Sequence, residues 1–414
     1  MYSASTHAYE FEPSDRGYRW MMLAGVWLAY SSFGLVSGAI PPLIGPLSED
    51  LNLSWAAMGS ILGAWPLVYI AMAVPAGALI DRFGLRRSLA AGVVLIAISG
   101  LLRSVAVNYA TLFLAVALFG LGGPFISIGA PKLISVWFNR RDRGAAIGLY
   151  MTASPVGRVV ALATANSILM PAFGWSWRLT LASYAGVALL AGLIWWALTR
   201  DLRHPDGQAA DSRGSLTTGL YVFPFLLRMR VVQIILVLSA GSFFFRHGFN
   251  NWLPEILRAG GMTAAQAGFW AALPILVGIG ATVIVPPMAK PSRRIPILVG
   301  IFLASGAAAV IVGTASGAPL VFGLLLEGAA GIGVAPIIML TLMDAPQVGA
   351  KHMGAAGGLY FAAGEVGGVL GPVLVGVVAD MTGGFLGGLL MLAIVSVALA
   401  LVAVGLRTAL RTGL

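Results

Sequence analysis

The chain has 414 residues, of which 59% are hydrophobic and 10% are charged, and its formal net charge is +10. A soluble protein carries about 25% charged residues, so this composition, with a mean hydropathy of +0.92, excludes a soluble enzyme, a disordered regulator and a soluble nucleic-acid-binding protein. The lack of cysteine excludes disulfides, thiolate zinc sites and cysteine nucleophiles, and the four histidines are too widely spread to indicate a metal cluster. We therefore expect a membrane protein without a cofactor.

Apolar segments long enough to cross a bilayer dominate the chain. A spanning helix needs about 20 mostly apolar residues, and twelve segments qualify: 20–45, 55–80, 86–104, 110–137, 143–170, 176–198, 230–257, 264–288, 294–314, 317–341, 353–378 and 384–408. The start of the chain is polar and lacks the basic residues and cleavage site of a signal peptide, so we expect the first span to be retained. A polar stretch predicts a linker at 199–229 between six-helix bundles at 1–198 and 230–414.

Basic residues are unequally divided between the two sides that this topology predicts. With the N-terminus inside the cell, most arginines and lysines fall in cytoplasmic segments, while Arg103, Arg178 and Arg258 fall near the opposite side. Such an excess is typical of the cytoplasmic side of membrane proteins. We therefore expect a multi-pass protein of the cell inner membrane with both termini in the cytoplasm, whose basic charge reflects topology and not nucleic-acid binding.

The two halves of the chain resemble each other. Gly144–Tyr150 (GAAIGLY) matches Gly354–Tyr360 (GAAGGLY), and the match continues to Gly157 and Gly367. Further echoes at nearly the same offset indicate a duplication, although helices rich in small residues also match by chance. Because six helices per half is an even number, both halves begin on the same side of the membrane, which predicts parallel repeats related by an axis along the membrane normal.

A charged loop between the second and third predicted spans reads GALIDRFGLRR from Gly77 to Arg87. It resembles the G-x-x-x-D-R-x-G-x-R-R signature of the major facilitator superfamily, and the agreement in topology, length and repeat extends over the whole chain. The resemblance implies an all-α membrane protein with 12 transmembrane helices in two six-helix bundles. It also implies a transporter and not an enzyme.

The resemblance further implies that this loop latches the cytoplasmic side in one conformation. The residues that match the signature are Gly77, Asp81, Arg82, Gly84, Arg86 and Arg87. We expect Gly77 to permit close helix approach, Asp81 to pair with basic residues or a helix N-terminus, and Gly84 to form a tight turn. An ordinary positively charged loop is the alternative. The second-half loop, Pro287–Arg294, keeps the basic end without the acid, which predicts an asymmetric latch.

Ionisable residues fall deep inside several predicted spans, where they are costly and usually functional. Arg246 and Asn250 share one helix face, and the resemblance implies that their helix lines the central cavity. Because the planar guanidinium fork suits a carboxylate, we predict that Arg246 binds an anionic substrate and that Asn250 adds a hydrogen bond. The alternative is an arginine that extends outward or pairs structurally. His247 either relays protons or packs as a neutral histidine.

Three further deep charges complete the predicted site. Arg158 in the fifth span is either a second anion ligand or a structural pair between helices. Its context, Ser154–Arg158, departs from the G-P-x-x-G-G motif of drug-exporting members of the superfamily, which disfavours export. Glu365, and after it Glu327, are predicted to couple transport to protons, because a buried carboxylate can hold and release a proton. The alternative is that each neutralises an arginine.

Four other side chains have weaker signals. Tyr30 and Tyr69 are predicted to line the cavity, although packing or an interfacial position also accounts for them. Lys132 is expected to reach the membrane surface as an interfacial lysine. Asp344 is expected to belong to the cytoplasmic gate.

Together these features predict a secondary transporter that moves a small, carboxylate-like organic anion by alternating access, coupled to protons. The chain has no G-x-x-x-x-G-K-[ST] loop that would indicate ATP. The alternatives are a proton-antiport exporter of amphipathic drugs or metabolites and a receptor that transports nothing. We expect a monomer in the lipid bilayer whose partners are a small molecule and protons, with no cofactor, metal or nucleic acid.

Overall fold

The computed structural model describes residues 13–199, 222–288, 290–331, 333–344 and 348–412, and this part of the chain is helical without strands. The long helices are α1 (Pro13–Ser37), α3 (Trp55–Phe83), α4 (Leu85–Ser104), α5 (Tyr109–Trp137), α6 (Arg140–Thr164), α8 (Trp177–Leu198), α11 (Arg230–Ala259), α12 (Ala264–Met288), α13 (Arg294–Thr314), α14 (Gly317–Gly331), α15 (Val334–Asp344), α16 (Gly349–Thr382) and α17 (Leu386–Thr412). The described residues contain twelve candidate membrane spans, which confirms the predicted fold class.

Polar residues at helix starts explain where several spans begin. The side chains of Ser54, Asn139 and Ser176 each accept a hydrogen bond from the first turn of α3, α6 and α8. Asn108 forms a reciprocal capping box with Thr111 at the start of α5. These contacts satisfy backbone donors that a first helical turn leaves free. Of these four capped spans, α3, α5 and α8 begin within one residue of the predicted positions, and α6 begins three residues earlier.

Three spans are less regular than predicted. In the fifth, α6 ends at Thr164 and a π-helical turn at Ala165–Leu169 leads into α7 (Met170–Ala172). The sequence predicts one helix over 20–45, but α1 ends at Ser37, and a 3-10 turn at Pro41–Leu43 leads into the short α2 (Ile44–Leu51). The prolines at this turn lack the N–H groups that a continuous helix needs. The tenth span, predicted over 317–341, is divided into α14 and α15. Of the predicted linker 199–229, residues 200–221 lie outside the described residues, and Val222–Arg228 forms the helix α10.

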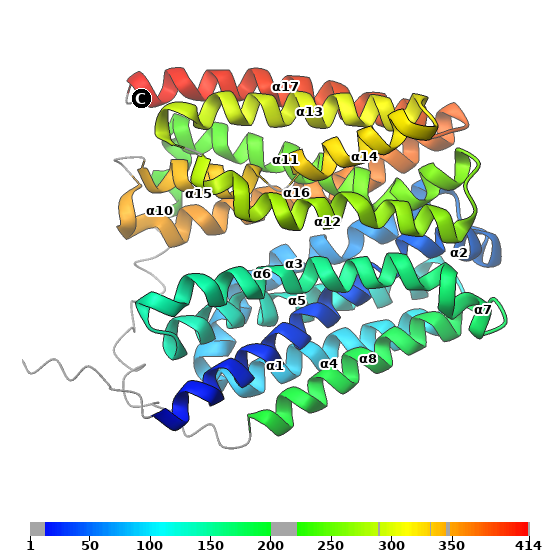
Figure 1. The fold of residues 1–414 in the computed structure, drawn as a ribbon, viewed down its shortest axis with the longest axis horizontal. Coiled ribbons are helices and arrows are strands. Elements are labelled where there is room, and N and C mark those ends of the chain that lie inside the picture. The colour runs from blue at the N-terminus through cyan, green and yellow to red at the C-terminus, as the bar shows by residue number, and fades with distance from the viewer. Residues whose placement is uncertain (1–12, 200–221, 289, 332, 345–347, 413–414) are drawn as a thin grey trace, which may run out of the picture.

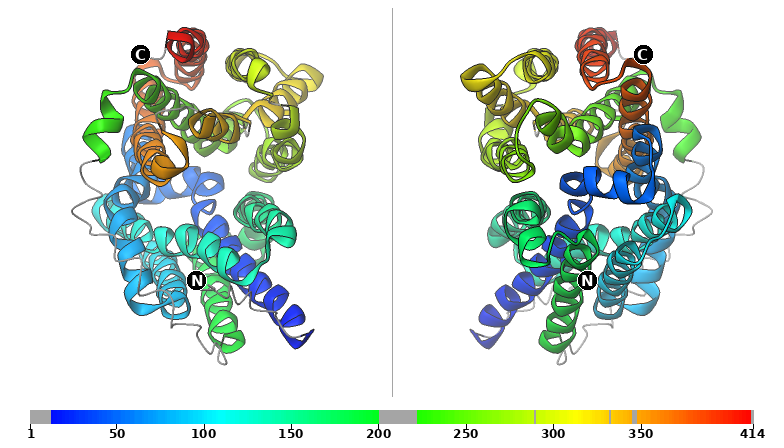
Figure 2. Two further views of the ribbon diagram at one scale, coloured as in Figure 1. Left: turned by 90° about the vertical axis from the view of Figure 1, so that its left-hand side faces the viewer. Right: turned by 90° about the vertical axis from the view of Figure 1, so that its right-hand side faces the viewer.

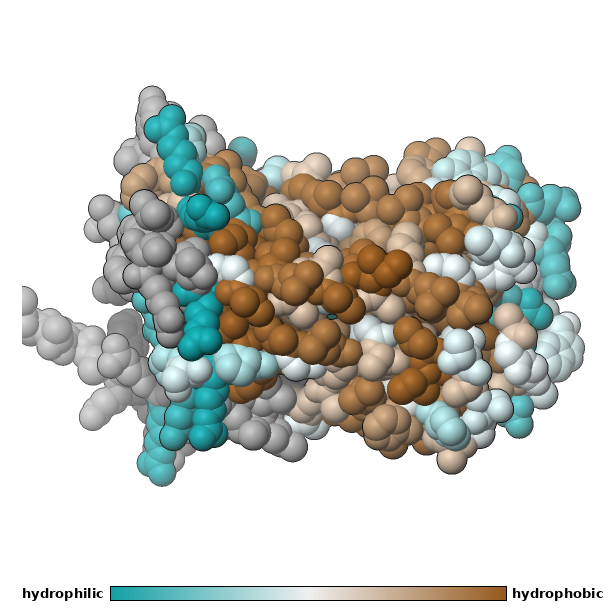
Figure 3. All heavy atoms as spheres, turned by 90° about the horizontal axis from the view of Figure 1, so that it is seen from above, coloured by the Kyte–Doolittle hydropathy of each residue, from teal (hydrophilic) through white to brown (hydrophobic). Residues whose placement is uncertain are grey.

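The helices form two bundles that lie side by side (Figures 1 and 2). In one bundle α3 and α4 pack on α5, and α1 packs on α6; in the other α11 packs on α16, and α13 on α17. Helix α1 begins, and helix α17 ends, at the same end of the molecule, which is called the terminal end below. The opposite end carries α2 and α7 (Met170–Ala172) and is called the far end. Figure 3 shows an apolar band between two polar ends.

Glycines of the repeated segment make equivalent close contacts in the two bundles. A Cβ atom on Gly157 of α6 would lie 1.9 Å from the Ser31 carbonyl oxygen of α1, and one on Gly367 of α16 would lie 1.8 Å from the Ala240 carbonyl oxygen of α11. Only a residue without a side chain permits backbones to approach this closely. The pair α1 and α6 and the pair α11 and α16 are therefore each held together by a close glycine contact at the equivalent position, which supports a duplication.

The bundles meet at the far end and separate toward the terminal end. A Cβ atom on Gly59 of α3 would lie 2.4 Å from the Pro372 carbonyl oxygen of α16, and one on Gly376 would lie 2.3 Å from the Trp55 carbonyl oxygen. By contrast, a Cβ atom on Gly148 or Gly358, nearer the terminal end, would have no atom within 4 Å among the described residues. The space between the bundles is therefore closed at the far end.

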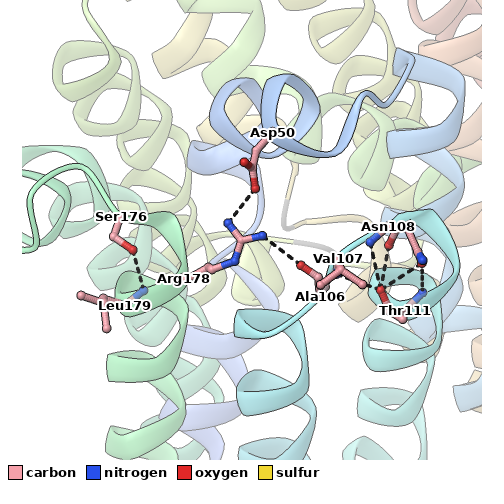
Figure 4. Close-up of polar contacts among 8 residues, drawn as sticks. All are labelled: Asp50, Ala106, Val107, Asn108, Thr111, Ser176, Arg178 and Leu179. Atoms are coloured by element: carbon pink, nitrogen blue, oxygen red, sulfur yellow. Dashed lines mark hydrogen bonds and ion pairs between the residues drawn. The ribbon is translucent and has the colours of Figure 1, made fainter.

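Polar contacts at the far end brace the N-terminal bundle (Figure 4). The Arg178 guanidinium of α8 pairs with the Asp50 carboxylate of α2 at 2.6 Å and donates to the Ala106 carbonyl oxygen at 3.3 Å. A second arginine, Arg103, is buried inside the same bundle and donates to the Val36 carbonyl oxygen at 2.8 Å. This bond satisfies one of the carbonyl groups that the end of α1 leaves free.

Candidate functional site

Arg246 lies in the middle of α11. Its side chain is exposed, although neighbouring residues of the helix are buried. It contributes to the wall of a cavity in the C-terminal bundle. Its charge interacts electrostatically with residues of both bundles: Tyr30, Arg158, Glu327 and Glu365. Tyr30 and Arg158 belong to α1 and α6 of the other bundle. Arg246 is therefore the point at which the predicted site residues of the two bundles come together.

Arg158 contacts the opposite bundle directly. Its Nη2 atom donates a hydrogen bond to the Asn251 side-chain oxygen on α11, while its Nε atom has no partner among the described residues. Gly38 makes room for it, because a Cβ atom there would lie 2.8 Å from the Arg158 Cγ atom. Sequence reasoning selected Asn250, which is partly buried, and missed Asn251, which is buried. Nothing in the spacing along one helix identifies the amide that an opposing helix reaches.

His247 lies in the seam between the bundles. Its ring stacks on Phe243 of the same helix, with ring centres 5.8 Å apart, and lies 5.7 Å from the ring of Trp65 on α3. Its Nδ1 atom has no hydrogen-bond partner in the described part of the chain. Both this nitrogen and the Glu365 Oε2 atom lie within 3.1 Å of the position that a Cβ atom on Gly368 would take. His247 therefore adjoins the Glu365 carboxylate.

The two predicted acids are buried in the C-terminal bundle. Glu365 on α16 is 7% exposed and Glu327 on α14 is 3% exposed. The Oε2 atom of each lacks a hydrogen-bond partner among the described residues. Ser305 of α13 is a hydrogen-bond partner for the Glu327 carboxylate. Each acid thus lies within electrostatic reach of Arg246 but keeps an oxygen available for a proton or another ligand.

Aromatic residues form the N-terminal side of the site. The ring of Tyr30 stacks on Tyr150, with ring centres 4.6 Å apart, and on Phe33 at 5.5 Å. The Tyr69 hydroxyl shares a hydrogen bond of 2.7 Å with Ser127. Both tyrosines are partly buried, so each presents one face to the packed bundle and leaves part of its surface free. Their suggested cavity-lining role stays a prediction.

The two bundles do not meet at the signature loop, Gly77–Arg87, in this structure. Asp81 of α3 pairs with Lys132 of α5, so the lysine that we expected to reach the membrane surface has an acidic partner within its own bundle. The expected close approach at Gly77 was wrong for this conformation, because a Cβ atom there would have open space around it among the described residues. The bundles are apart at this end, so no helix in the described part of the chain approaches Gly77. Gly84 has the positive φ of 80° expected of a tight turn.

The arginines of the loop turn toward different neighbours. Arg86 lies 4.1 Å above the ring of Trp196 and donates to its carbonyl oxygen at 3.2 Å, which ties the loop to α8. Arg82 lies over the ring of Phe83, and Arg87 is exposed. In the other bundle, Asp344 pairs with Arg294 at 2.7 Å. In this structure that contact joins two helices of one bundle and not the two bundles.

An acid that the sequence analysis missed closes the far end. Asp380 of α16 accepts hydrogen bonds from the backbone N–H groups of Trp55, at 3.1 Å, and Ala56, at 2.8 Å, at the start of α3. A carboxylate at a helix N-terminus satisfies free donors and complements the helix dipole. Asp380 lies two residues before the last residue of α16, as Asp81 does in α3. That matching position is the signal that could have found it.

We expect the Asp380→Ala variant to favour the state in which the far end is open. Loss of a helix cap costs about 0.5–2 kcal/mol, which corresponds to a shift of about 2- to 30-fold in the conformational equilibrium. Because the chain has no cysteine, a single Gly148→Cys reporter near the open terminal end can be labelled without background. The labelling rate should fall in the Asp380→Ala background. The matched control is Asp50→Ala, whose carboxylate pairs with Arg178 inside one bundle; equal rates in both backgrounds would contradict a latch at Asp380.

Two bundles of apolar helices that are closed at one end around a charged centre define a membrane transporter of the two-bundle type. The family model of the Major Facilitator Superfamily matches residues 22–372. The chain therefore belongs to the major facilitator superfamily, and it is a transporter and not an enzyme.

Relatives and solved structures agree with this assignment. The chain is 27% identical over 394 residues to a putative tartrate transporter of Agrobacterium vitis, with 89% of this chain and 88% of the relative covered. It is 23% identical to the probable galactarate/D-glucarate transporter GudP of Escherichia coli, with 87% of each chain covered. It is 26% identical to the 2-nitroimidazole transporter of Escherichia coli, with 92% and 94% covered.

The fold also has a close structural counterpart. The crystal structure of a bacterial homologue of the human lysosomal transporter Spinster, in an inward-facing and unoccupied conformation, matches with a TM-score of 0.76 over 97% of this chain and 98% of that chain. The sequence identity is 17%. The likeness shows that the two proteins share one fold.

Proposed function

We propose that the protein moves a small, carboxylate-like organic anion across the inner membrane by alternating access, coupled to protons. The observation that carries this proposal is the pair of deep arginines, Arg158 and Arg246, which come from opposite bundles and repel each other electrostatically. Holding two like charges near one another is unfavourable unless a counter-charge joins them. An anion bound between the bundles supplies that counter-charge, and it contacts both halves that must move.

The relatives support a carboxylate substrate. Two of them are named for tartrate and for galactarate or glucarate, which are sugar acids with a carboxylate at each end. Arg246 offers a planar fork that binds one carboxylate through two parallel hydrogen bonds. Arg158 offers a second cation on the opposite bundle, and Tyr30 and Asn250 add hydroxyl and amide groups for the substrate's hydroxyls.

The transport cycle follows from the two ends of the molecule. The excess of basic residues in the segments that share a side with the N-terminus supports a cytoplasmic terminal end, so the present structure corresponds to a state open to the cytoplasm. Asp380 holds the far end closed by capping α3. Rocking of the bundles would open the far end and bring the signature loop, with Asp81, against the opposite bundle.

Proton coupling fits the charges around the two arginines. When the Glu365 and Glu327 carboxyl groups are protonated, the positive charges of Arg158 and Arg246 are uncompensated. These two charges then attract an anion. When the carboxylates are ionised, they neutralise the arginines and the anion is released. Protonation therefore favours substrate binding, so an inward proton gradient drives uptake of the anion.

A second function has its own supporting observation. The aromatic side chains of Tyr30, Trp65 and Tyr69 suit a flat apolar ring, and one relative is named for 2-nitroimidazole. A proton-antiport exporter of amphipathic compounds is therefore the alternative. The departure of Ser154–Arg158 from the exporter motif counts against it.

Transport assays with purified protein in proteoliposomes separate the two functions. We expect uptake of tartrate or galactarate to exceed that of an uncharged alditol of equal chain length by about 10- to 100-fold, because a hydrogen bond to a charged group contributes about 1.5–3 kcal/mol. Acidifying the outside should accelerate this uptake. Transport of 2-nitroimidazole without transport of any carboxylate would contradict an anion carrier and support the exporter.

A further inference from the structure

A polar notch lies at the start of α6, at the terminal end of the molecule. It is lined by Arg19 of α1, by Asn139, which caps α6, and by Arg141 and Asp142 in the first turn of α6. Its volume of about 270 Å³ is room for several water molecules or for one phosphate group. All four residues belong to the N-terminal bundle, and none of them takes part in the proposed transport site.

Three side chains offer unused hydrogen-bond donors to this notch. Arg19 is 8% exposed and pairs with Asp142 through its Nη2 atom at 2.6 Å, but its buried Nε atom has no partner among the described residues. Arg141 is exposed and makes no hydrogen bond or ion pair with another described residue. The Asn139 Oδ1 atom accepts the Asp142 backbone N–H at 3.0 Å, which leaves the amide N–H groups for another acceptor. A buried donor without a partner indicates a missing ligand.

The electrostatics of the notch favour an anion. Two arginines and one aspartate line it, which leaves one net positive charge, and Asp142 is already paired with Arg19. The notch also stands at the N-terminus of the 25-residue helix α6, whose free N–H groups and dipole attract anions. Arginine binds the oxygens of a phosphate through two parallel hydrogen bonds. A singly charged phosphate diester therefore matches both the donors and the charge.

An exposed apolar surface adjoins the notch. The Arg19 guanidinium lies 5.4 Å from the centre of the Phe138 ring, and the Trp20 ring packs edge-on against the same ring at 5.1 Å. Trp20 is 40% exposed, and Met21, which follows it, is 39% exposed. Tryptophan is typical of the boundary between headgroups and acyl chains. A free phosphate makes no use of this surface, whereas a lipid places its acyl chain on it.

We propose that the notch binds the headgroup of an anionic phospholipid, such as phosphatidylglycerol. Arg141 and the Nε atom of Arg19 bind the phosphate oxygens, and the acyl chain lies beside Trp20. Basic pockets next to membrane helices bind anionic headgroups in this way. A zwitterionic headgroup fits less well because it brings its own cation close to the two arginines. The bound lipid joins the starts of α1 and α6, so it stabilises the N-terminal bundle.

Phosphatidylglycerol added to the purified protein in detergent micelles tests this site, with phosphatidylcholine at the same mole fraction for comparison. The readouts are the lipid retained in native mass spectrometry and the thermal midpoint. We expect phosphatidylglycerol to be retained and to raise the midpoint more than phosphatidylcholine. Arg141→Gln should raise the half-saturating mole fraction of phosphatidylglycerol about fivefold. Equal responses to the two lipids, or an unchanged response in Arg141→Gln, would overturn the proposal.

Two further variants separate a built site from other sources of binding. Arg407→Gln removes an exposed arginine near the end of α17, at the same end of the molecule but outside the notch, and should bind the lipid as the wild type does. An equal loss in Arg407→Gln and Arg141→Gln would show diffuse attraction to a basic surface and overturn the notch.

Inorganic phosphate distinguishes a lipid from a free anion. We expect Trp20→Ala to weaken binding of phosphatidylglycerol and to leave any binding of phosphate unchanged. Phosphate binding that Arg141→Gln abolishes, with lipid binding that Trp20→Ala leaves intact, would assign a free anion and overturn the lipid. Lipid binding is measured without transport, so the outcome does not depend on the proposed substrate.

Discussion

We expect the Arg246→Gln variant to lose uptake of the organic anion by at least about 30-fold. The proposed two-pronged contact with a carboxylate offers two hydrogen bonds to a charged group, each of which contributes about 1.5–3 kcal/mol, and about 1.4 kcal/mol corresponds to a factor of ten. Because the Arg246 side chain is exposed, shortening it should change the packing of α11 against α16 little. The measurement is initial uptake into proteoliposomes at saturating and subsaturating substrate.

Two further variants give this prediction its controls. Arg246→Lys keeps the charge but loses the planar fork, so it should retain an intermediate activity. Arg178→Gln removes an arginine whose pair with Asp50 is about two-fifths exposed, and an exposed pair contributes little. Its uptake should match that of the wild type. Wild-type uptake in Arg246→Gln would contradict the anion site, and an equal loss in Arg178→Gln would show that any lost arginine impairs the protein.

The second large effect is on stability. Gly367→Ala would place a methyl group 1.8 Å from the Ala240 carbonyl oxygen, so α16 and α11 must move apart. Overpacking usually costs about 1–3 kcal/mol, and we expect a value at the upper end because the obstacle is backbone and not a flexible side chain. The thermal midpoint of the purified protein should fall, and Gly157→Ala, which meets Ser31 at 1.9 Å, should behave in the same way.

The same helix provides the matched control. Gly358→Ala adds a methyl group with no atom within 4 Å among the described residues. Alanine favours a helix over glycine by about 1 kcal/mol, so this variant should be as stable as the wild type or more stable. If Gly358→Ala and Gly367→Ala lowered the thermal midpoint equally, the loss would reflect a general intolerance of side chains on α16 and not the close approach to α11.

Prediction from sequence succeeded where one helix or one loop carries the signal. Hydrocarbon requires about 20 apolar residues per span and buried backbone partners, so the twelve helices and their approximate bounds follow from composition alone. The signature from Gly77 to Arg87 and the repeat of Gly157 as Gly367 indicated the family and the duplication in the same way.

Prediction failed, or had nothing to say, where two helices meet. Asn251 and not Asn250 receives the Arg158 hydrogen bond. Asp81 pairs with a basic residue, as expected, but that residue is Lys132, which was expected to reach the membrane surface. The far-end cap by Asp380 joins residues more than 300 positions apart. Such contacts depend on the rotation and the offset of one helix against another, which the periodicity of either helix alone does not specify.

The amino-acid sequence by itself determined that the protein is a twelve-helix membrane transporter with deep arginines and acids, because the bilayer and the repeated motif act on local stretches of chain. Only the tertiary structure decided which end is closed, that a Cβ atom on Gly77 would have open space around it among the described residues, and that Arg246 lines a pocket of the C-terminal bundle. The reason is that these features belong to the relative position of two bundles. The same sequence must support more than one such position in order to transport.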